Sequence, residues 1–353
     1  MKKTCTPRSV RNNKYSPYPF LPRPLKLSEQ SWNENVMPLV SVSCQAYMHA
    51  PFIREAIEGF LMQETTFRVE IVIHDDASTD GTTDIIREYE KKHPHLFTCF
   101  YQTENTYIHP EKTALRKPFK EAKLGKYVAL CEGDDYWTDP LKLQKQFIFL
   151  EEHPEYSFCV GGFMRLYDDT KQHVSRLRQI KENDTGKSGY TFSLPEMQRN
   201  WLTQPLTAMY RRALLKHFDL SKYKYTRDVH LFYHLAKTGK AFYFTEYFGV
   251  HRFHPGGVHS MQGKKKTRKT AYLIYNELYK VNRDTFTRRK LLISIKSIVG
   301  RTLFDKTRVV RLIKIPGLVL KGLFLIRPVA DFDFFFRSSK SSTFNAYYEE
   351  DNH

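Results

Sequence analysis

The sequence predicts an α/β protein built on a mostly parallel sheet flanked by helices. Between residues 38 and 154, short runs rich in β-branched residues alternate with helical stretches, and acidic motifs follow two of these runs. Strands that alternate with helices form βαβ crossovers, which lay the strands parallel in one sheet. Hydrophobic residues make up 41% of the 353-residue chain, enough to bury a sizeable core.

The elements of this sheet are expected in a definite order. Strands are predicted at residues 39–44, 69–76, 95–101 and 125–135, and helices at 51–64, 82–93 and 139–154. Pro51 and Pro140 favour helix starts, because the first turn needs no N–H from the residue there, and Asp139 is a candidate N-cap. Beyond Pro154 the rhythm is less regular, with strands expected at 156–169, 202–212 and 241–254 and a helix at 227–239.

Charge divides the chain into three parts. Residues 1–37 hold 7 basic and 2 acidic residues with five prolines, which predicts a disordered arm. Residues 38–263 are nearly neutral, with 29 basic and 28 acidic residues, and form the predicted catalytic domain. Residues 264–353 are expected to be a basic helical extension, because residues 264–327 alone hold 18 basic and 3 acidic residues.

Neither export nor a membrane span is expected. No run of eighteen apolar residues is present, and the N-terminus lacks the apolar stretch of a secretory signal. The five cysteines are odd in number and widely spaced, so they predict neither a disulfide framework nor a zinc site. We therefore expect a cytoplasmic protein.

The first acidic motif, residues 74–81, follows a predicted strand. Carboxylates that leave a strand end in an open α/β sheet face the ligand crevice, and we expect Asp76 to contact a ligand there. For Ser78, Thr79 and Asp80 the favoured interpretation is that one of them caps the following helix.

The second acidic motif places Glu132, Asp134 and Asp135 directly after a buried strand. Three carboxylates so close together repel one another unless a cation neutralises them, and oxygen ligands favour Mg²⁺ or Mn²⁺. Such a cation could bridge a diphosphate to the protein. The alternative is a solvated acidic turn.

In order along the chain, these motifs make residues 38–263 resemble the inverting glycosyltransferases of family 2, which have the GT-A fold with a Rossmann-like nucleotide-binding half. The resemblance rests on the segments LVSVSCQAY, EAIEGFLMQE, DDASTDG, GKYVALCEGDDYWTDPLKLQKQ and VHRFHPGGVHS. It implies that Tyr47, Asp76 and Asp134 bind the nucleotide sugar, and that Asp135 ligates a metal ion with Glu132 nearby. Met48 stands where the family usually has Asn.

The resemblance also implies a catalytic base. Family members place this carboxylate at the start of a helix that follows the acceptor segment, and Asp228 occupies that place. On its sequence context alone, Asp228 would instead be read as a helix cap or first-turn acid. Arg227, which replaces the family's acid or glycine, should lower the pKa of its neighbour.

Two further residues are implied by the resemblance. His254 matches the histidine of a Tyr-Arg-x-His element and can complete the metal or diphosphate site, with a structural hydrogen-bonding role as the alternative. His251 stands where the family has tyrosine and is not expected to be a ligand. Trp201 lies where acceptors usually stack, although a buried core tryptophan is the ordinary alternative.

The basic residues 264–327 are interleaved with Leu, Ile, Val and Phe, which suits a helix lying on an anionic membrane surface. Packing against the sheet domain is an alternative. Nucleic-acid binding is not expected, because no zinc or helix-turn-helix pattern accompanies the charge. A location on the inner face of the cytoplasmic membrane would suit a lipid-linked glycan acceptor.

The sequence as a whole therefore predicts a metal-dependent inverting glycosyltransferase that uses Mn²⁺ or Mg²⁺. We expect a nucleotide-sugar donor, with a UDP-sugar first among the candidates, and a glycan acceptor in cell-surface polysaccharide assembly. The alternative from another class is a non-catalytic protein of the same fold that binds a nucleotide sugar or an anionic membrane surface.

Overall fold

A computed structural model describes residues 19–107, 114–167, 172–176, 188–199, 202–219, 222–223, 227–257 and 264–304. The chain forms two compact units. The first contains residues 1–154, 206–213 and 247–251, and the second contains residues 155–205, 214–246 and 252–353. Residues 264–304, which lie in the predicted basic extension, are grouped with the second unit.

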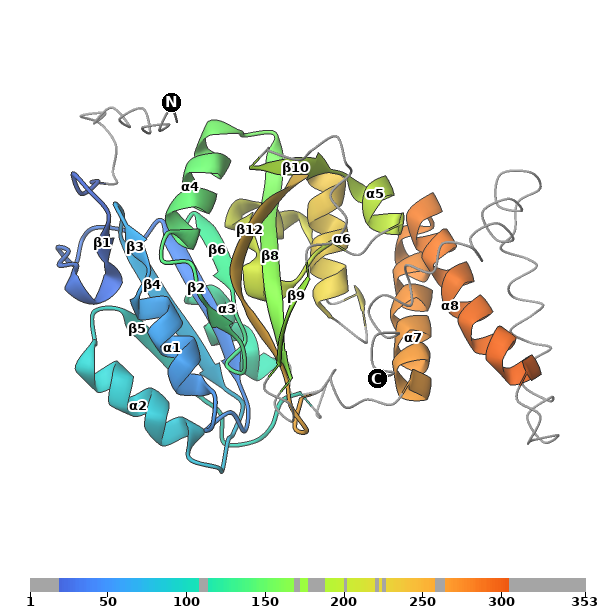
Figure 1. Cartoon of the computed structure of the whole chain (residues 1–353), viewed down its shortest axis with the longest axis horizontal. Coiled ribbons are helices and arrows are strands. Elements are labelled where there is room, and N and C mark those ends of the chain that lie inside the picture. The colour runs from blue at the N-terminus through green and yellow to red at the C-terminus, as the bar shows by residue number, and fades with distance from the viewer. Residues whose placement is uncertain are drawn as a thin grey trace. The chain divides into compact units, whose positions relative to one another are not determined.

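The first unit is built on the predicted parallel sheet (Figure 1). Its strands are β2 (Val40–Ala46), β4 (Val69–Asp75), β5 (Phe97–Tyr101), β6 (Tyr127–Leu130) and β11 (Met209–Arg211). The order is β11-β6-β2-β4-β5, with β11 antiparallel to β6 and the other four parallel. All residues of β4 are buried, as expected for a central strand covered on both faces.

Helices connect these strands. They are α1 (Ile53–Leu61), α2 (Thr82–Lys92), α3 (Lys117–Glu121) and α4 (Lys142–Glu152). Gly81, at φ 98°, adopts the left-handed conformation immediately before α2, where a side chain would be strained. Helix α4 begins three residues after Asp139, which we predicted to be its N-cap. The Asp139 carboxylate instead accepts the backbone N–H of Leu141 (2.8 Å) and pairs with Lys145 (2.7 Å).

Part of the predicted N-terminal arm is folded. A short strand β1 (Leu25–Lys26) pairs antiparallel with β3 (Glu64–Thr65), and a 3₁₀ helix follows at Leu27–Glu29. Leu27 is fully buried, and the Gln30 side chain donates to the backbone carbonyls of Leu25 and Thr65. These contacts tie residues 25–30 to Glu64 and Thr65, so this part of the chain is folded despite its proline-rich and basic composition.

The second unit combines antiparallel strands with helices. The strands are β8 (Tyr156–Tyr167), β9 (Gln172–Arg176), β10 (Gly189–Phe192) and β12 (Lys240–Phe253), in the order β10-β12-β8-β9. The helices are α5 (Leu194–Arg199), α6 (Asp228–Thr238), α7 (Lys264–Asn282) and α8 (Thr285–Phe304). The expected strand at 202–212 is only the three residues of β11, flanked by 3₁₀ helices at Pro205–Thr207 and Arg212–His217.

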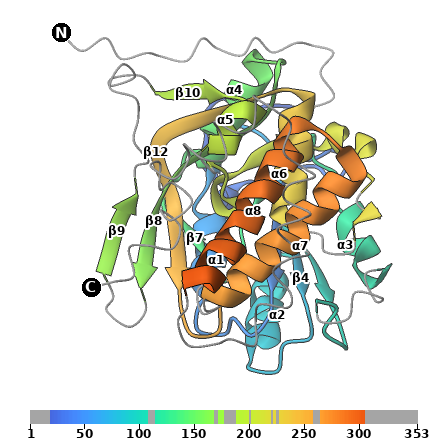
Figure 2. The same cartoon turned by 90° about the vertical axis from the view of Figure 1, so that its right-hand side faces the viewer.

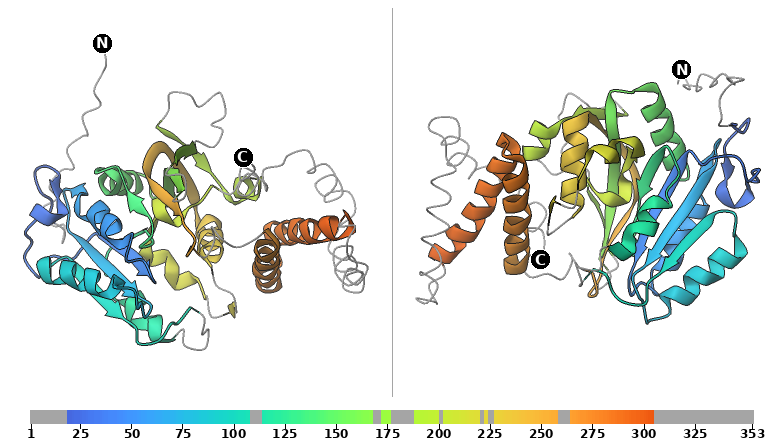
Figure 3. Two further views of the ribbon diagram at one scale, coloured as in Figure 1. Left: turned by 60° about the horizontal axis from the view of Figure 1, so that its bottom comes forward. Right: turned by 180° about the vertical axis from the view of Figure 1, so that it is seen from behind.

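Aromatic side chains form the core of the second unit. Phe158 of β8 packs on Phe192 of β10 (ring centroids 5.8 Å apart) and on Phe232 of α6 (5.5 Å), and all three are buried. Helices α7 and α8 lie side by side (Figures 2 and 3). Leu278 of α7 and Leu291 and Leu292 of α8 are fully buried. Much of the apolar surface of this helical hairpin, α7–α8, is therefore used in packing.

Strand β12 contributes to both units, since its residues Tyr247–His251 belong to the first. There, Gly249 and Val250 pair antiparallel with the short strand β7 (Tyr136–Trp137), which follows the second acidic motif. This pairing brings His251 next to that motif. None of the helices in the described ranges has the length and apolar character that a membrane span requires.

Candidate active site

The acidic motifs meet at one edge of the parallel sheet in the first unit. Register aligns Ala46 at the end of β2 with Asp75 at the end of β4, and Ser43 of β2 with Leu130 at the end of β6. The three segments that leave these strands therefore start close together, as predicted for an open α/β sheet. The site is built from these three segments and from His251.

The turn after β2 is fastened to the turn after β4. Three consecutive backbone N–H groups of the first turn donate to side chains of the second. The pairs are Met48 to Ser78 Oγ (2.9 Å), His49 to Thr82 Oγ1 (2.8 Å) and Ala50 to Asp80 Oδ2 (3.0 Å). Much of the DDASTDG motif thus holds the backbone in place.

The N-cap of α2 is Gly81, so none of Ser78, Thr79 and Asp80 is the capping residue. Asp80 comes closest to that role, since its Oδ1 accepts the backbone N–H of Thr82 at the start of α2 (3.1 Å). Inside the turn, the buried Asp75 accepts hydrogen bonds from Ser78 and from the Thr83 hydroxyl. Met48 (φ 57°) and Ala77 (φ 67°) have left-handed backbones that non-glycine residues seldom adopt. The network of hydrogen bonds around them holds this strained geometry.

Asp76 is buried and its carboxylate is fully engaged by a neighbouring segment. Oδ1 accepts the backbone N–H (2.8 Å) and the hydroxyl (2.5 Å) of Thr106, while Oδ2 accepts the backbone N–H of Tyr107 (3.0 Å) and Nη2 of Arg116 (3.0 Å). Burial opposes ionisation, but the hydrogen bonds from Thr106 and the Arg116 charge hold the pKa of Asp76 below its usual range. Asp76 is therefore ionised and joins Thr106, Tyr107 and Arg116.

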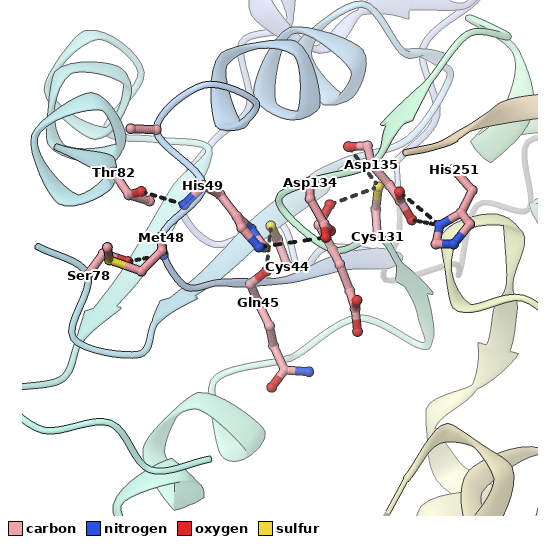
Figure 4. A network of polar contacts seen from close by, with 12 residues as sticks. Cys44, Gln45, Met48, His49, Ser78, Thr82, Cys131, Asp134, Asp135 and His251 are labelled. Carbon is pink, nitrogen blue, oxygen red and sulfur yellow. Dashed lines mark hydrogen bonds and ion pairs between the residues drawn. The ribbon is translucent and has the colours of Figure 1, made fainter. Parts of the chain in front are cut away.

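The second acidic motif lies between two histidines (Figure 4). Asp135 is only 3% exposed, and both of its carboxylate oxygens lie within hydrogen-bond distance of His251 Nδ1 (3.0 and 3.1 Å). His49 Nε2 lies 3.7 Å from Asp134 Oδ2. Glu132, by contrast, is exposed. Each of the two adjacent carboxylates thus faces an imidazole from a distant part of the chain.

Close packing fixes this arrangement. A Cβ on Gly133 would come within 2.9 Å of His49 Nδ1 and 2.8 Å of the Ile53 side chain, so a larger residue between the acids would have to displace these side chains. Cys44 and Cys131 are fully buried beside the motif, and burial raises the pKa of both thiols. Both side chains are therefore neutral thiols.

The two histidines were not among the predicted site residues. His251 was set aside because it replaces a tyrosine, and His49 had no motif of its own. A histidine on a strand that pairs beside an acidic turn can be predicted as a site residue. For His251 that prediction needs the register between β7 and β12, which the sequence does not reveal.

The second unit holds the predicted base. Asp228 is half-buried at the first residue of α6, and Arg227 precedes the helix with an extended backbone. The structure confirms the first-turn position that its sequence context predicted. Nearby, the fully buried His230 accepts the Arg227 backbone N–H at Nδ1 (3.0 Å), and burial lowers the pKa of His230 to about 4.

The remaining predicted residues are dispersed. Tyr47 belongs to the first unit and is 45% exposed, which leaves its ring available for stacking. His254 is buried and belongs to the second unit. Trp201 lies outside the described residues. Within the ranges that the structure covers, no group of three or more His, Cys, Asp or Glu residues is arranged to hold a metal ion.

Comparison with known proteins identifies the chain's relatives. Residues 41–218 match the family model for glycosyl transferase family 2. The putative teichuronic acid biosynthesis glycosyltransferase TuaG of Bacillus subtilis is 27% identical over 249 residues, which cover 70% of this chain and 91% of TuaG. WfaP of Escherichia coli, a UDP-Glc:α-D-GlcNAc-diphosphoundecaprenol β-1,3-glucosyltransferase, is 36% identical over 115 residues, covering 33% of this chain and 42% of WfaP.

A solved structure shows the same fold. Residues 1–349 of Staphylococcus aureus TarS in complex with UDP-GlcNAc align with a TM-score of 0.58 and 16% identity, covering 87% of each chain. The chain spans only about a third of the length of its mycobacterial relatives. The Mycobacterium bovis protein Mb1547, for example, is 47% identical over 133 residues, which are 38% of this chain and 36% of Mb1547.

Proposed function

Because the chain belongs to glycosyl transferase family 2 and is a glycosyltransferase, we propose that it moves a sugar from a nucleotide-sugar donor to a glycan acceptor with inversion at the anomeric carbon. The observation that carries this proposal is the pair Asp134 and Asp135 at the sheet edge, with His251 within hydrogen-bond distance of Asp135 and His49 3.7 Å from Asp134. The names of TuaG and WfaP support a role in polysaccharide assembly, and that of WfaP supports a lipid-linked acceptor.

A divalent cation, Mn²⁺ or Mg²⁺, fits the residues at this edge. Such ions are often held by one or two carboxylates while substrate phosphates supply further oxygens, so a ready-made protein cage is not required. Asp135 is the ligand we propose, with Glu132 and His254 as further candidates. When bound, the cation would neutralise charge that develops on the leaving diphosphate.

For the nucleotide we propose Tyr47, Asp76 and Asp134. Tyr47 would stack on the base, and Asp134 would lie close to the sugar-diphosphate end. Each lone pair of the Asp76 carboxylate already has a donor from Thr106, Tyr107 or Arg116. Direct contact with the base therefore requires that one of these donors be exchanged for the ligand.

In the transfer step, Asp228 takes the proton of the acceptor hydroxyl. The freed oxygen forms a bond to the anomeric carbon while the bond from that carbon to the diphosphate breaks, and the nucleoside diphosphate leaves with the electron pair. A carboxylate that removes this proton in the transition state makes the hydroxyl a far better nucleophile. Trp201 remains our candidate for acceptor stacking.

Calorimetric titration with UDP, GDP and dTDP, each with and without Mn²⁺, tests the donor site. We expect one nucleotide to bind in a Mn²⁺-dependent manner, and Asp135→Ala to lose that dependence. Asp139→Ala is a matched control, since it removes a carboxylate near the motif that is occupied by Leu141 and Lys145. Silence with all three nucleotides, or unchanged Mn²⁺-dependent binding in Asp135→Ala, would refute the metal-dependent donor site.

For the basic segment we propose peripheral binding to an anionic membrane surface. Residues 264–304 hold 12 basic and 2 acidic residues, a net charge of +10. Because the hairpin's buried leucines are already used in packing, attraction should come from charge, worth about 1 kcal/mol per basic residue near the surface.

Co-sedimentation with vesicles checks this partner. We expect the protein to bind vesicles that contain phosphatidylserine and not to bind purely zwitterionic vesicles. Salt at about 0.5 M should release it, because the screening length is short at that concentration. Salt-resistant binding would indicate apolar insertion instead, and no binding to either vesicle would exclude the membrane surface as a partner.

A further inference from the structure

The turn between α7 and α8 is hydrogen-bonded to α6, the helix that begins at Asp228. Arg283 and Asp284 form this turn after Asn282, the last residue of α7, and Arg283 adopts a left-handed backbone (φ 53°) that is unusual for a residue with a side chain. The residues on either side of Arg283 both form hydrogen bonds that lead to α6. A strained turn that is held in place by its neighbours' contacts indicates that those contacts matter.

Asp284 connects two helices through its two carboxylate oxygens. Oδ1 accepts the backbone N–H and the hydroxyl of Thr287, both at 2.9 Å, and so caps the start of α8. Oδ2 accepts the hydroxyl of Tyr233 on α6 and lies 3.5 Å from Lys237 Nζ, also on α6. Burial opposes ionisation, but the Thr287 and Tyr233 hydrogen bonds and the Lys237 charge hold the pKa of Asp284 below its usual range.

Asn282 makes a second connection. Its Nδ2 donates to the hydroxyl of Tyr223 (2.8 Å), and that hydroxyl lies 2.9 Å from His234 Nε2 on α6. Phe286, in the first turn of α8, stacks on the Tyr233 ring with centroids 5.5 Å apart. The Tyr233 ring is fully buried, so its hydroxyl must find a partner in the interior, and Asp284 provides one.

We propose that the α7–α8 turn positions α6 for catalysis, with Tyr233 and Asp284 as positioning residues for Asp228. This inference rests on the proposed function, because it assumes that Asp228 is the base. A helix moves as a rigid body over short distances, and Tyr233 lies five residues, about 7.5 Å along the axis, from Asp228. A displacement of about 1 Å at a reacting group can lower a rate by about a hundredfold.

The Tyr233→Phe variant of the full chain tests the proposal, because it keeps the buried ring and its stack on Phe286 and removes only the hydroxyl. With the nucleotide sugar selected by the titration, the rate of nucleoside diphosphate release gives kcat and the donor KM. We expect kcat to fall about tenfold while the donor KM is unchanged. Asp284→Asn should behave similarly, and the double variant should lose little more, because the two residues share one interaction.

Tyr156→Phe is the matched control. It removes a tyrosine hydroxyl of β8 that is 2.5 Å from Thr191 Oγ1 of β10 in the same unit. We expect a comparable loss of unfolding temperature but less than a twofold change in kcat. Hydrogen exchange supplies a readout independent of turnover: amides of residues 228–235 should exchange faster in Tyr233→Phe than in Tyr156→Phe.

The outcomes separate this inference from the proposed base. Unchanged kcat and unchanged exchange in Tyr233→Phe, together with loss of turnover in Asp228→Asn, would overturn the positioning role and leave the base in place. Full turnover in Asp228→Asn would refute the base itself. An equal loss of kcat in Tyr156→Phe would show general destabilisation and would also overturn the positioning role.

Discussion

Asp228→Asn is expected to lower the transfer rate about 10²- to 10⁴-fold while donor binding stays within about twofold of the wild type, because general acid–base catalysis typically contributes a factor of this size. Asparagine keeps the shape of aspartate but cannot take the acceptor proton. The fold should survive, since loss of a first-turn charge costs roughly 0.3–1 kcal/mol at a helix N-terminus. Steady-state kinetics with calorimetric donor titration measures both quantities.

A second first-turn acid provides the control. Asp84 lies in the first turn of α2, where it is 3.9 Å from Arg87 and exposed. Asp84→Asn should remove a similar helix-dipole interaction and leave turnover unchanged. If Asp228→Asn keeps full turnover, the base is another residue. If the wild type and the variant both bind donor and neither transfers sugar, the protein is a nucleotide-sugar-binding module that kept the fold without the reaction.

Much of the first unit could be predicted because its signals are local. The β-branched runs become β2 and β4, and the Thr82 segment becomes α2 with bounds that differ by one residue. The end of the sheet where the acidic motifs meet follows from the same alternation. The predicted strand at 202–212 shrank to three residues because short antiparallel pairing, here β11 on β6, depends on a distant partner.

Site residues were predictable only where their role is local. Asp80 accepts the backbone N–H of Thr82 at the start of α2, a contact within its own turn that is close to the capping role its sequence context indicated. The engagement of Asp76 was not predictable, because its donors lie 30 to 40 residues further along the chain. His251 is 116 residues from Asp135, and neither residue type nor spacing suggests that they meet.

The basic helices show the same limit. Their charge indicated an anionic partner, and the sequence also left packing open as an alternative. The structure shows that packing is real, since Asn282 and Asp284 bond to residues in and just before α6. A hydrogen bond from Tyr233 to Asp284 spans 51 residues, so only the folded chain reveals that the basic segment and the predicted base belong to one unit.

The second large expected effect is on stability, and it comes from a buried histidine immediately before the DDASTDG motif. His74 of β4 is fully buried under Phe119 of α3 (ring centroids 5.1 Å apart), and neither ring nitrogen has a hydrogen-bond partner among the described residues. Burial and the nearby Arg116 lower the pKa of His74 to about 4, although Asp75 and Asp76 act in the opposite direction. Lys123, whose charge also acts to lower the pKa of His74, is itself buried, and burial lowers the pKa of Lys123 to about 7.

His74 should therefore make the first unit acid-sensitive. In the unfolded chain its pKa is about 6.5, so below that pH the unfolded state binds a proton that the folded state refuses until about pH 4. The stability it contributes is complete above pH 6.5 and is lost as the pH falls from 6.5 towards 4. Between pH 7 and pH 5 the free energy of unfolding should fall by about 2 kcal/mol because of this one residue.

Urea unfolding of the wild type and of His74→Phe at pH 7 and pH 5 measures this contribution. Phenylalanine suits the apolar contact with Phe119 and cannot titrate, so the variant should lose about 2 kcal/mol less than the wild type on acidification. His95→Phe, at an exposed position, is the control. It should lose as much unfolding free energy between pH 7 and pH 5 as the wild type does. Equal losses of unfolding free energy in His74→Phe and the wild type would mean that His74 binds its proton in the folded state. That would require α3, which packs on His74 through Phe119, to move away in acid.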